Sequence, residues 1–416
     1  MAGAACAPSD ATEESASELN ATANDDPWGP RSVLPSGTPV ENRPPNASSQ
    51  RPAFRGQTRS PGDRTNVAFD VRVTASGLSR PWAIAFLPDG AKLVTERPGR
   101  MRIIAENGAL SEPLAGLPAI AARGQGGLLD VVLAPSFAET SQIYFTYSEP
   151  RTGGNGLVLA RAKLVRGATP SLTNVESIWR MTQTSSSSVH FGSRIVFDRD
   201  GHVFVTVGER GVSNGAGNAR DLGSSYGKVI RLNLDGSIPL DNPYVNRPGA
   251  LPEVFSSGHR NPQSAALHPK TGQLWTVEHG ARGGDEVNII RPGKDYGWPT
   301  VTYGIDYSGA TIGSGVTAAA GIEQPVYYWD PVIAPAGAAF YDAAAFPAWR
   351  GSLFVGGLAG EHLVRLTISE DRVVGEERLL TARRARIRDV RVGPAGTIFV
   401  SDETNGQILE LVPRGS

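Results

Sequence analysis

The sequence has a single cysteine, Cys6, among its 416 residues, so no disulfide can form within the chain. It has no run of about 18 apolar residues, the length that a membrane-spanning helix needs. It also has no excess of either charge, because 40 Lys and Arg residues stand against 41 Asp and Glu residues. The resulting net charge of −1 argues against a nucleic acid or an anionic membrane as the main partner.

Glycine and proline are abundant instead. The 49 glycines and 31 prolines exceed the usual share of these residues, whereas the apolar fraction is an ordinary 40%. Turns therefore interrupt the chain often, and we expect a turn-rich globular fold rather than a helical one.

The N-terminal part of the chain differs in composition from the rest. Residues 1–66 are rich in Ala, Ser, Pro, Asn and Asp and have neither helical nor strand periodicity, which is typical of a disordered leader or linker. Cys6 follows small residues, as the acylated cysteine of a bacterial lipoprotein does; a bystander cysteine in a tail is the alternative. A periplasmic or extracellular location, with a lipid anchor on Cys6, is a hypothesis, since the apolar segment of a signal peptide is absent.

The C-terminal residues 411–416 read LVPRGS, which is typical of a protease-cleavage scar from an expression vector. We therefore expect the folded domain to cover residues 67–412.

One pattern recurs through this domain: an apolar strand, a turn that contains Gly, and a second strand, in most copies with an acidic residue at its end. A weaker copy, with a longer loop in place of the turn glycine, covers residues 133–149. The clear copies cover residues 86–96, 197–209, 267–278, 346–357 and 392–403.

Each copy has the pattern of a β-hairpin. The six turns are roughly 45 to 80 residues apart, the spacing of four-stranded blades with loop insertions. The sequence therefore predicts an all-β fold, a six-bladed β-propeller of four-stranded antiparallel sheets. A large β-sandwich is the alternative, but a sandwich would not repeat the same turn six times.

Propellers bind ligands on the loops over the central channel, so the polar loops between the repeats are the candidate site. His190 precedes one hairpin and Glu209 follows it, so both side chains can reach the same rim of the channel. A carboxylate beside a histidine fixes one ring tautomer and leaves the other nitrogen as a base near neutral pH. An isolated surface histidine is the alternative.

Cationic and amide side chains mark three other loops. Arg260 and Asn261 are adjacent, and Arg386 and Arg388 share one face of a strand. A guanidinium presents a rigid fork of donors, so three arginines from separate blades predict an anionic ligand at one mouth of the channel. Gln125, in the glycine-rich GQGGLLD, taken alone is more typical of a surface amide.

The segment HGARGGDEVN, residues 279–288, combines glycines with Asp285 and Glu286. Exposed backbone carbonyls beside carboxylates suit a hard cation such as Ca²⁺. The sequence has no Cys and His cluster of the kind that binds zinc.

Seven segments in this order resemble the soluble aldose sugar dehydrogenases that use pyrroloquinoline quinone (PQQ), which are relatives of soluble glucose dehydrogenase. The resemblance covers about residues 70–412 and rests on RPWAIAFLPDG, GQGGLLDV, HFGSR, GHRNPQ, EHGARGGDEVN, DYGWP and RIRDV. It implies PQQ and Ca²⁺ as cofactors and oxidation of an aldose at C1 to the lactone. It also implies an external electron acceptor, such as a quinone, a cytochrome or a dye, and a monomer or weak dimer.

The resemblance assigns roles residue by residue. His190 matches the general base, Glu209 the acid that orients it, and Arg260 a group that stabilises the developing oxyanion together with calcium. Other positions match contacts to PQQ: Gln125, Arg260, Asn261, Tyr307, Arg386, Arg388 and the loop of Leu358, Ala359 and Gly360. The remaining positions match calcium ligands: the backbone of Gly280 and Ala281 and, for a second site, Glu286 and Tyr296.

The sequence departs from the glucose dehydrogenases at two positions. Ala359 stands where those enzymes have a lysine that contacts PQQ, and Val189 stands where they have an aspartate. We therefore expect a changed affinity for PQQ and a broad range of aldoses.

Two other functions are compatible with the same fold. A calcium-dependent lactonase would need side-chain carboxylates and an Asn around the metal, and the three arginines would then have no role. A non-catalytic propeller that binds a protein or a glycan would leave His190 and Glu209 unexplained.

Overall fold

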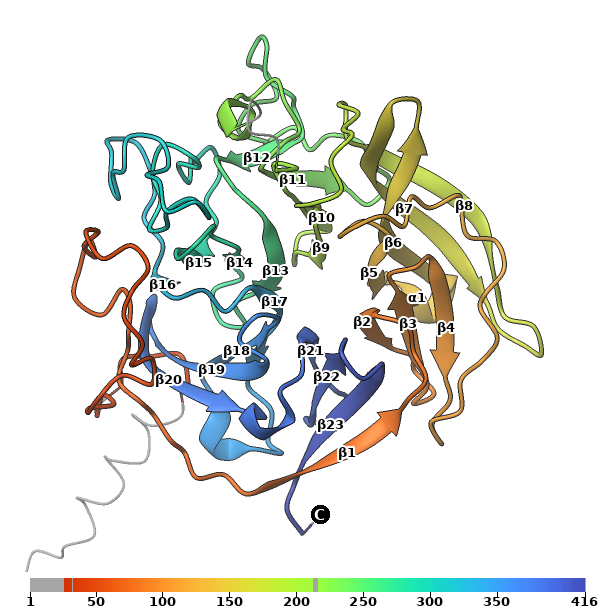
Figure 1. The fold of residues 1–416 in the computed structure, drawn as a ribbon. Coiled ribbons are helices and arrows are strands. Elements are labelled where there is room, and N and C mark those ends of the chain that lie inside the picture. The colour runs from red at the N-terminus through yellow and green to blue at the C-terminus, as the bar shows by residue number, and fades with distance from the viewer. Residues whose placement is uncertain (1–25, 32, 212–215, 416) are drawn as a thin grey trace, which may run out of the picture.

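The computed structural model describes residues 26–31, 33–211 and 216–415. Its strands form six sheets, or blades, arranged in a ring (Figure 1). The first blade has three strands, β2 (Pro81–Phe86), β3 (Lys92–Glu96) and β4 (Arg100–Ile104). The second has four, β5 (Leu128–Leu133), β6 (Gln142–Arg151), β7 (Gly154–Val165) and β8 (Ser171–Arg180), with the short helix α1 (Phe137–Thr140) between β5 and β6. Neighbouring strands pair antiparallel.

Three further blades of four strands each follow in chain order. The third has β9 (Gly192–Phe197), β10 (His202–Val207), β11 (Lys228–Asn233) and β12 (Val254–Ser257). The fourth has β13 (Pro262–Leu267), β14 (Leu274–Glu278), β15 (Asp285–Ile289) and β16 (Tyr327–Trp329). The fifth has β17 (Pro335–Tyr341), β18 (Ser352–Gly357), β19 (His362–Ser369) and β20 (Arg372–Leu379).

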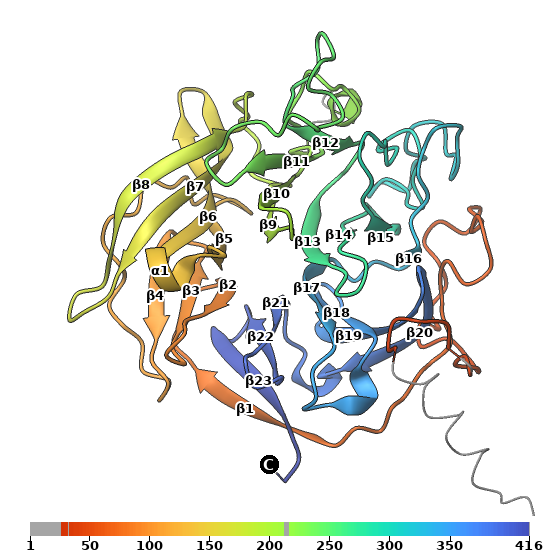
Figure 2. The same ribbon diagram turned by 180° about the vertical axis from the view of Figure 1, so that it is seen from behind.

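The sixth blade joins the two ends of the domain. It has β21 (Ile387–Val392), β22 (Ile398–Asp402) and β23 (Gln407–Pro413), and its outer strand is β1 (Phe69–Ala75). Strand β1 pairs antiparallel with β23, from Phe69 opposite Pro413 to Ala75 opposite Ile408. This pairing closes the ring of six sheets, which Figure 2 shows from the other side.

The predicted six-bladed propeller is confirmed. Five of the six repeats run from the end of the innermost strand of a blade through its second strand, whereas the repeat at residues 346–357 contains only the second strand, β18, because β17 ends at Tyr341. Two further details differ. The blade β2–β4 has three strands rather than four. Leu411 and Val412, which the sequence places in a vector scar, are both buried in β23, where Leu411 lies between Val71 of β1 and Ile398 of β22.

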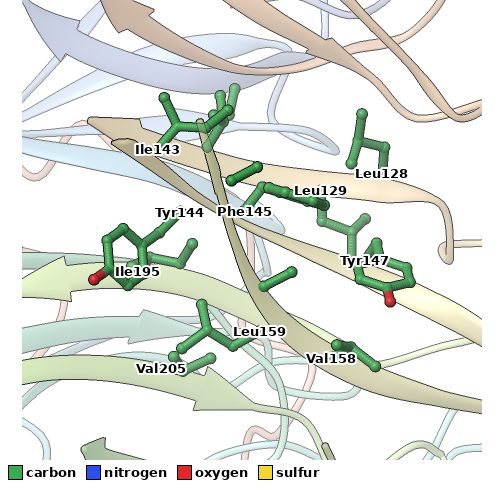
Figure 3. Packing of buried hydrophobic residues seen from close by; sticks show 14 of the residues in the cluster. Leu128, Leu129, Ile143, Tyr144, Phe145, Tyr147, Val158, Leu159, Ile195 and Val205 are labelled. Atoms are coloured by element: carbon green, nitrogen blue, oxygen red, sulfur yellow. The ribbon is translucent and has the colours of Figure 1, made fainter. Parts of the chain in front are cut away.

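The core lies between adjacent blades, so the inner strands are buried on both faces. Figure 3 shows this packing where Phe145 and Leu159 of the second blade belong to the same cluster as Ile195 and Val205 of the third. Burying a side chain of this size stabilises the fold by about 1.5–3 kcal/mol. The alternating apolar residues of the repeats therefore supply the contacts that hold neighbouring blades together.

The six inner strands surround a channel with two different ends. Their C-terminal halves line an apolar cavity of about 570 Å³, with Phe86, Leu133 and Phe197 among its walls. Their N-terminal ends carry the loops that the sequence predicts to hold the site.

A layer of four charged side chains crosses the channel between these ends. Arg194 of β9 forms ion pairs with Asp130 of β5 (3.3 Å) and Asp389 of β21 (2.8 Å). Arg391 pairs with the same two carboxylates at 2.8 and 2.9 Å. The backbone N–H of Ile84 in β2 also donates to Asp389, at 3.0 Å. The layer therefore links four of the six blades.

The expected disorder of residues 1–66 is wrong for residues 26–31 and 33–66. Thr58 forms a parallel bridge with Tyr328 of β16, and Gly62 forms one with Glu376 of β20. In Figure 1 this segment, coloured red to orange, runs along the outer strands of two blades. Trp28 packs on the rings of His268 and Phe340. Residues 41–66 contact the sheet edges mainly through backbone and polar groups, which leave no apolar periodicity in the sequence. Cys6 lies outside the described residues.

No helix in the described ranges is long and apolar enough to cross a membrane.

We expect the charged layer to be essential for stability. Asp389→Ala should lower the free energy of unfolding by about 3–5 kcal/mol, because Arg194 and Arg391 would then share the single carboxylate of Asp130 and an uncompensated positive charge would be left in the channel. Urea denaturation followed by tryptophan fluorescence measures the change. Asp342→Ala is the matched control: it removes an exposed pair with Arg350 and should cost less than about 1 kcal/mol. Equal shifts in the two variants would contradict this role of the layer.

Candidate active site

His190 and Glu209 meet at one rim of the channel. The hairpin of β9 and β10 separates them, and Nδ1 of His190 is hydrogen-bonded to Oε1 of Glu209. The backbone N–H of His190 donates to Oε1 of Gln125 at 2.8 Å, across the gap between two blades. His190 has a φ of 52°, a left-handed conformation that is uncommon outside glycine and is frequent at functional sites.

The surroundings of His190 favour a neutral ring. Burial lowers its pKa below the ordinary 6.5, the hydrogen bond to Glu209 raises it, and the charge of Arg260 lowers it further. With Nδ1–H directed to Glu209, the lone pair lies on Nε2, which has no hydrogen-bond partner within the described part of the chain. The pair can therefore accept a proton at Nε2 near neutral pH.

The loops of the third and fourth blades are fastened to each other beside this pair. The N–H of Glu209 donates to the carbonyl of Arg260 at 2.9 Å. Asn261 accepts from the N–H of Gly192 at 3.1 Å and lies 3.4 Å from Nδ1 of His279. The predicted Asn261 thus connects the backbone that follows His190 to the ring of His279.

A cavity of about 460 Å³ opens next to these loops. It contains five of the residues that the sequence predicts to contact a cofactor, namely Gln125, Tyr307, Leu358, Arg386 and Arg388. Its other lining residues are Arg80, Arg97, Gln263, His279, Ala334 and Glu403. The structure therefore brings together loops from blades that are far apart in the sequence.

The charge in this cavity is unbalanced. Four arginines line it, and Glu403 is the one carboxylate among the described residues around it. Arg388 binds Glu403 at 2.8 Å, whereas Arg97 and Arg386 approach it only to 3.6 and 3.7 Å. Burial lowers the pKa of Arg388 to about 10, still above neutral pH. The cavity is therefore cationic and suits an anionic ligand.

The sequence analysis missed Arg80, Arg97 and Glu403. A signal was present for two of them, because Glu403 ends one hairpin repeat and Arg97 directly follows the acid that ends another. The end of the second strand of each repeat lies at the rim of the channel, as Glu209 does.

A second, enclosed cavity of about 10 Å³ lies beneath Arg260, with room for about one sphere the size of a water or an ion. Gly280, Glu286 and Tyr296, all predicted calcium residues, line it together with Glu278. Burial raises the pKa of Glu286 well above its ordinary value, and the nearby charge of Glu278 raises it further.

Six predicted residues line neither cavity: His190, Glu209 and Asn261, which lie beside the larger one, and Ala281, Ala359 and Gly360. Ala281 is buried next to Gly280 without lining either of them. The backbone N–H groups of Ala359 and Gly360 both donate to the carbonyl of Ile333 at 2.9 Å, so this turn folds back on its own blade. Leu358 alone of that loop faces the larger cavity.

A family model described as Glucose / Sorbosone dehydrogenase matches residues 78–410. The chain belongs to this family. An aldose sugar dehydrogenase of Escherichia coli is 42% identical over 348 residues, which are 83% of this chain and 93% of that protein. The family prediction is therefore confirmed.

Two solved structures of aldose sugar dehydrogenases support the assignment to the glucose/sorbosone dehydrogenase family. The apo-form from Escherichia coli is 41% identical with a TM-score of 0.80, over 83% of this chain and 100% of that one. The PQQ-bound form from Streptomyces coelicolor is 28% identical with a TM-score of 0.68, over 83% and 98% of the two chains.

We expect the imidazole of His190 to titrate below pH 6.5, because burial disfavours its charged form. Glu209→Gln should lower the pKa further, because it removes the contact that raises it. NMR titration of the ring resonances measures both values, and a His190→Gln variant identifies the signal. A pKa that rises in Glu209→Gln would contradict the arrangement.

Proposed function

We propose that this protein is a PQQ-dependent aldose dehydrogenase that oxidises the anomeric C1 hydroxyl to the lactone and passes the electrons to an external acceptor. The observation that carries the proposal is a neutral, carboxylate-oriented histidine next to a cavity with four arginines and one carboxylate.

The residues of the larger cavity fit PQQ. The quinone carries three carboxylates, and the arginines there have too few acidic partners of their own. Arg260 lines the smaller cavity instead, and its buried Nε has no hydrogen-bond partner among the described residues. Gln125, Tyr307, Arg386 and Arg388 would hold the cofactor from three blades, with Arg80 and Arg97 as further cations. Asn261 would act by fixing the loops behind it.

The loop after β14 fits Ca²⁺. Backbone carbonyls of Gly280 and Ala281 are hard oxygen ligands of the kind that calcium prefers. The carboxylates of Glu278 and Glu286 lie around the small cavity, and the buried Oδ1 of Asn288 has no donor among the described residues. An oxygen-rich space of this size suits a second cation. The hydroxyl of Tyr296 already donates to the carbonyl of Ile289 at 2.6 Å, so Tyr296 would contribute through its backbone.

The chain's own residues perform the proton transfer. His190 Nε2 takes the proton of the anomeric hydroxyl, and Glu209 stabilises the imidazolium that forms. The guanidinium of Arg260, which also stacks over the ring of Trp298 at 5.1 Å, stabilises negative charge as it develops on the sugar oxygen. PQQ, when bound, supplies the quinone that takes up the hydride from C1.

The rival functions account for less of the site. A lactonase has no use for four arginines around the cavity, and a binding propeller has no use for a base held by Glu209. A location outside the cytoplasm, a broad range of aldoses and a monomeric or weakly dimeric state stay predictions, as does acylation of Cys6.

We expect dye reduction with a panel of aldoses to need both PQQ and Ca²⁺. His190→Ala should reduce kcat by about 10²- to 10⁴-fold and leave the absorbance of bound PQQ unchanged, because the ring serves as a base and not as an anchor. His202→Ala is the matched control, since His202 is paired with Asp198 at 2.9 Å at the other end of the same blade and should be dispensable. Absence of PQQ-dependent absorbance and turnover in the wild type, with lactone hydrolysis in their place, would overturn the proposal.

Arg80 offers a test of the cationic cavity. Arg80→Ala should weaken PQQ binding by about tenfold at low ionic strength and by less at high salt, because the lost contact is charge-assisted and partly exposed. Titration of the cofactor absorbance measures the effect. Arg166→Ala, which removes an exposed arginine paired with Asp89 at a hairpin turn, should bind PQQ as the wild type does. Equal losses in both variants would mean that net charge, and not this cavity, sets the affinity.

A further inference from the structure

Residues 41–60, which we call the strap, precede the part of the chain that matches the family model, residues 78–410. The strap lies along β16, the outer strand of the fourth blade, where Thr58 bridges to Tyr328 and the N–H of Tyr328 donates to the carbonyl of Gln57 at 2.8 Å. Gln57 is fully buried. Its Oε1 accepts from the hydroxyl of Tyr303 at 3.0 Å, and its Nε2 donates to the carbonyl of Pro325 at 2.9 Å.

The strap also holds Asp330, which follows β16. The backbone N–H groups of Asn46 and Ala47 donate to the two carboxylate oxygens of Asp330 at 2.8 and 2.9 Å. The side-chain amide of Asn46 donates to Asp330 at 3.1 Å as well. The other side of this carboxylate lies against Gly283, where an added Cβ would be 2.8 Å from Cγ of Asp330. Asp330 is thus wedged between the strap and the loop that carries Gly280.

Two more contacts reach that loop directly. Oδ1 of Asn46 accepts from Nε of Arg282 at 3.2 Å, and Nε2 of Gln50 donates to the carbonyl of Gly304 at 3.1 Å. Arg282 and Ile305 exchange backbone hydrogen bonds at 3.0 Å in both directions. The strap therefore contacts two chain segments, residues 280–284 and 302–305, that are hydrogen-bonded to each other.

We propose that the strap positions residues 280–284, which we call the cation loop, and that Asn46 and Gln50 are its positioning residues. The inference rests on the proposed function, because it assigns the Gly280 and Ala281 carbonyls to Ca²⁺. These two segments contain four glycines, at positions 280, 283, 284 and 304, and therefore have many accessible conformations. Ordering them when a cation binds costs conformational free energy. The strap orders the loop in advance, so the cation binds more tightly.

The test compares Asn46→Ala/Gln50→Ala with the wild type. In the apoprotein, amide hydrogen exchange of residues 279–305 should become faster, while exchange of the hairpin with His190 and Glu209 stays unchanged. Calorimetric titration with Ca²⁺ should show an affinity about tenfold or more weaker, the usual loss for groups that support metal ligands. Saturating Ca²⁺ and PQQ should restore kcat, because the chemical groups are intact.

Thr65→Ala is the matched control. Thr65 anchors the segment next to the strap to the fifth blade, through Glu377 at 3.1 Å and Trp349 at 2.9 Å, and lies away from the cation loop. It should leave both exchange and Ca²⁺ affinity unchanged. Gln50→Ala alone, which removes one hydrogen bond, serves if the double variant does not fold, and should show a smaller change in the same direction.

The outcomes separate the two proposals. A wild type that binds neither Ca²⁺ nor PQQ overturns the proposed function, and with it the calcium role of the strap. A wild type that binds both, with variants that match it in exchange and affinity, overturns the strap alone. Equal changes in Thr65→Ala and the strap variants also overturn it, because they would reflect general loosening of the blades.

Discussion

The ion pairs among Asp130, Arg194, Asp389 and Arg391 are the constraint on which the site depends. Four buried charges cost much desolvation free energy, which is recovered only because each has two partners and fixed geometry. Arg194 also donates to the carbonyls of Gln263 at 2.7 Å and Arg388 at 2.9 Å, both in residues that line the larger cavity. The floor of the site is therefore set by a network that also sets the positions of the blades.

The layer of four charged side chains and the larger cavity differ in net charge. In the layer, two carboxylates face two guanidinium groups, so the layer is neutral without a ligand. Above it the cavity has four arginines and Glu403. Burial opposes the charge of Glu403, yet Arg388 and Arg386 outweigh that effect and lower its pKa, so Glu403 is already ionised at neutral pH. A bound anion would supply the missing negative charge, and its affinity would then depend on salt.

The fold was predictable because a hairpin is a local structure. Alternation and a turn glycine fall within about a dozen residues of sequence, and six copies determine the propeller. The strap was not predictable, since Gln57 and Asn46 contact sheet edges more than 250 positions away through polar groups. Arg97 was missed although it follows Glu96 at the end of a repeat. Ala359 and Gly360 lie away from the cavity because their N–H groups bond to Ile333, a contact that no sequence pattern shows.

The proposed catalytic pair and the proposed cofactor cavity likewise differ in how far apart their residues lie in the sequence. His190 and Glu209 are 19 positions apart on one hairpin, so local folding of the third blade already brings them together. The cavity draws on residues from Arg80 to Glu403, and its last wall forms only when β1 pairs with β23 and closes the ring. Opening of the sixth blade would thus disperse the arginines while leaving the histidine and its carboxylate in contact. A ligand that needs the closed ring would stabilise the closure by mass action, so binding of the proposed cofactor would be thermodynamically coupled to the pairing of the two ends of the propeller domain.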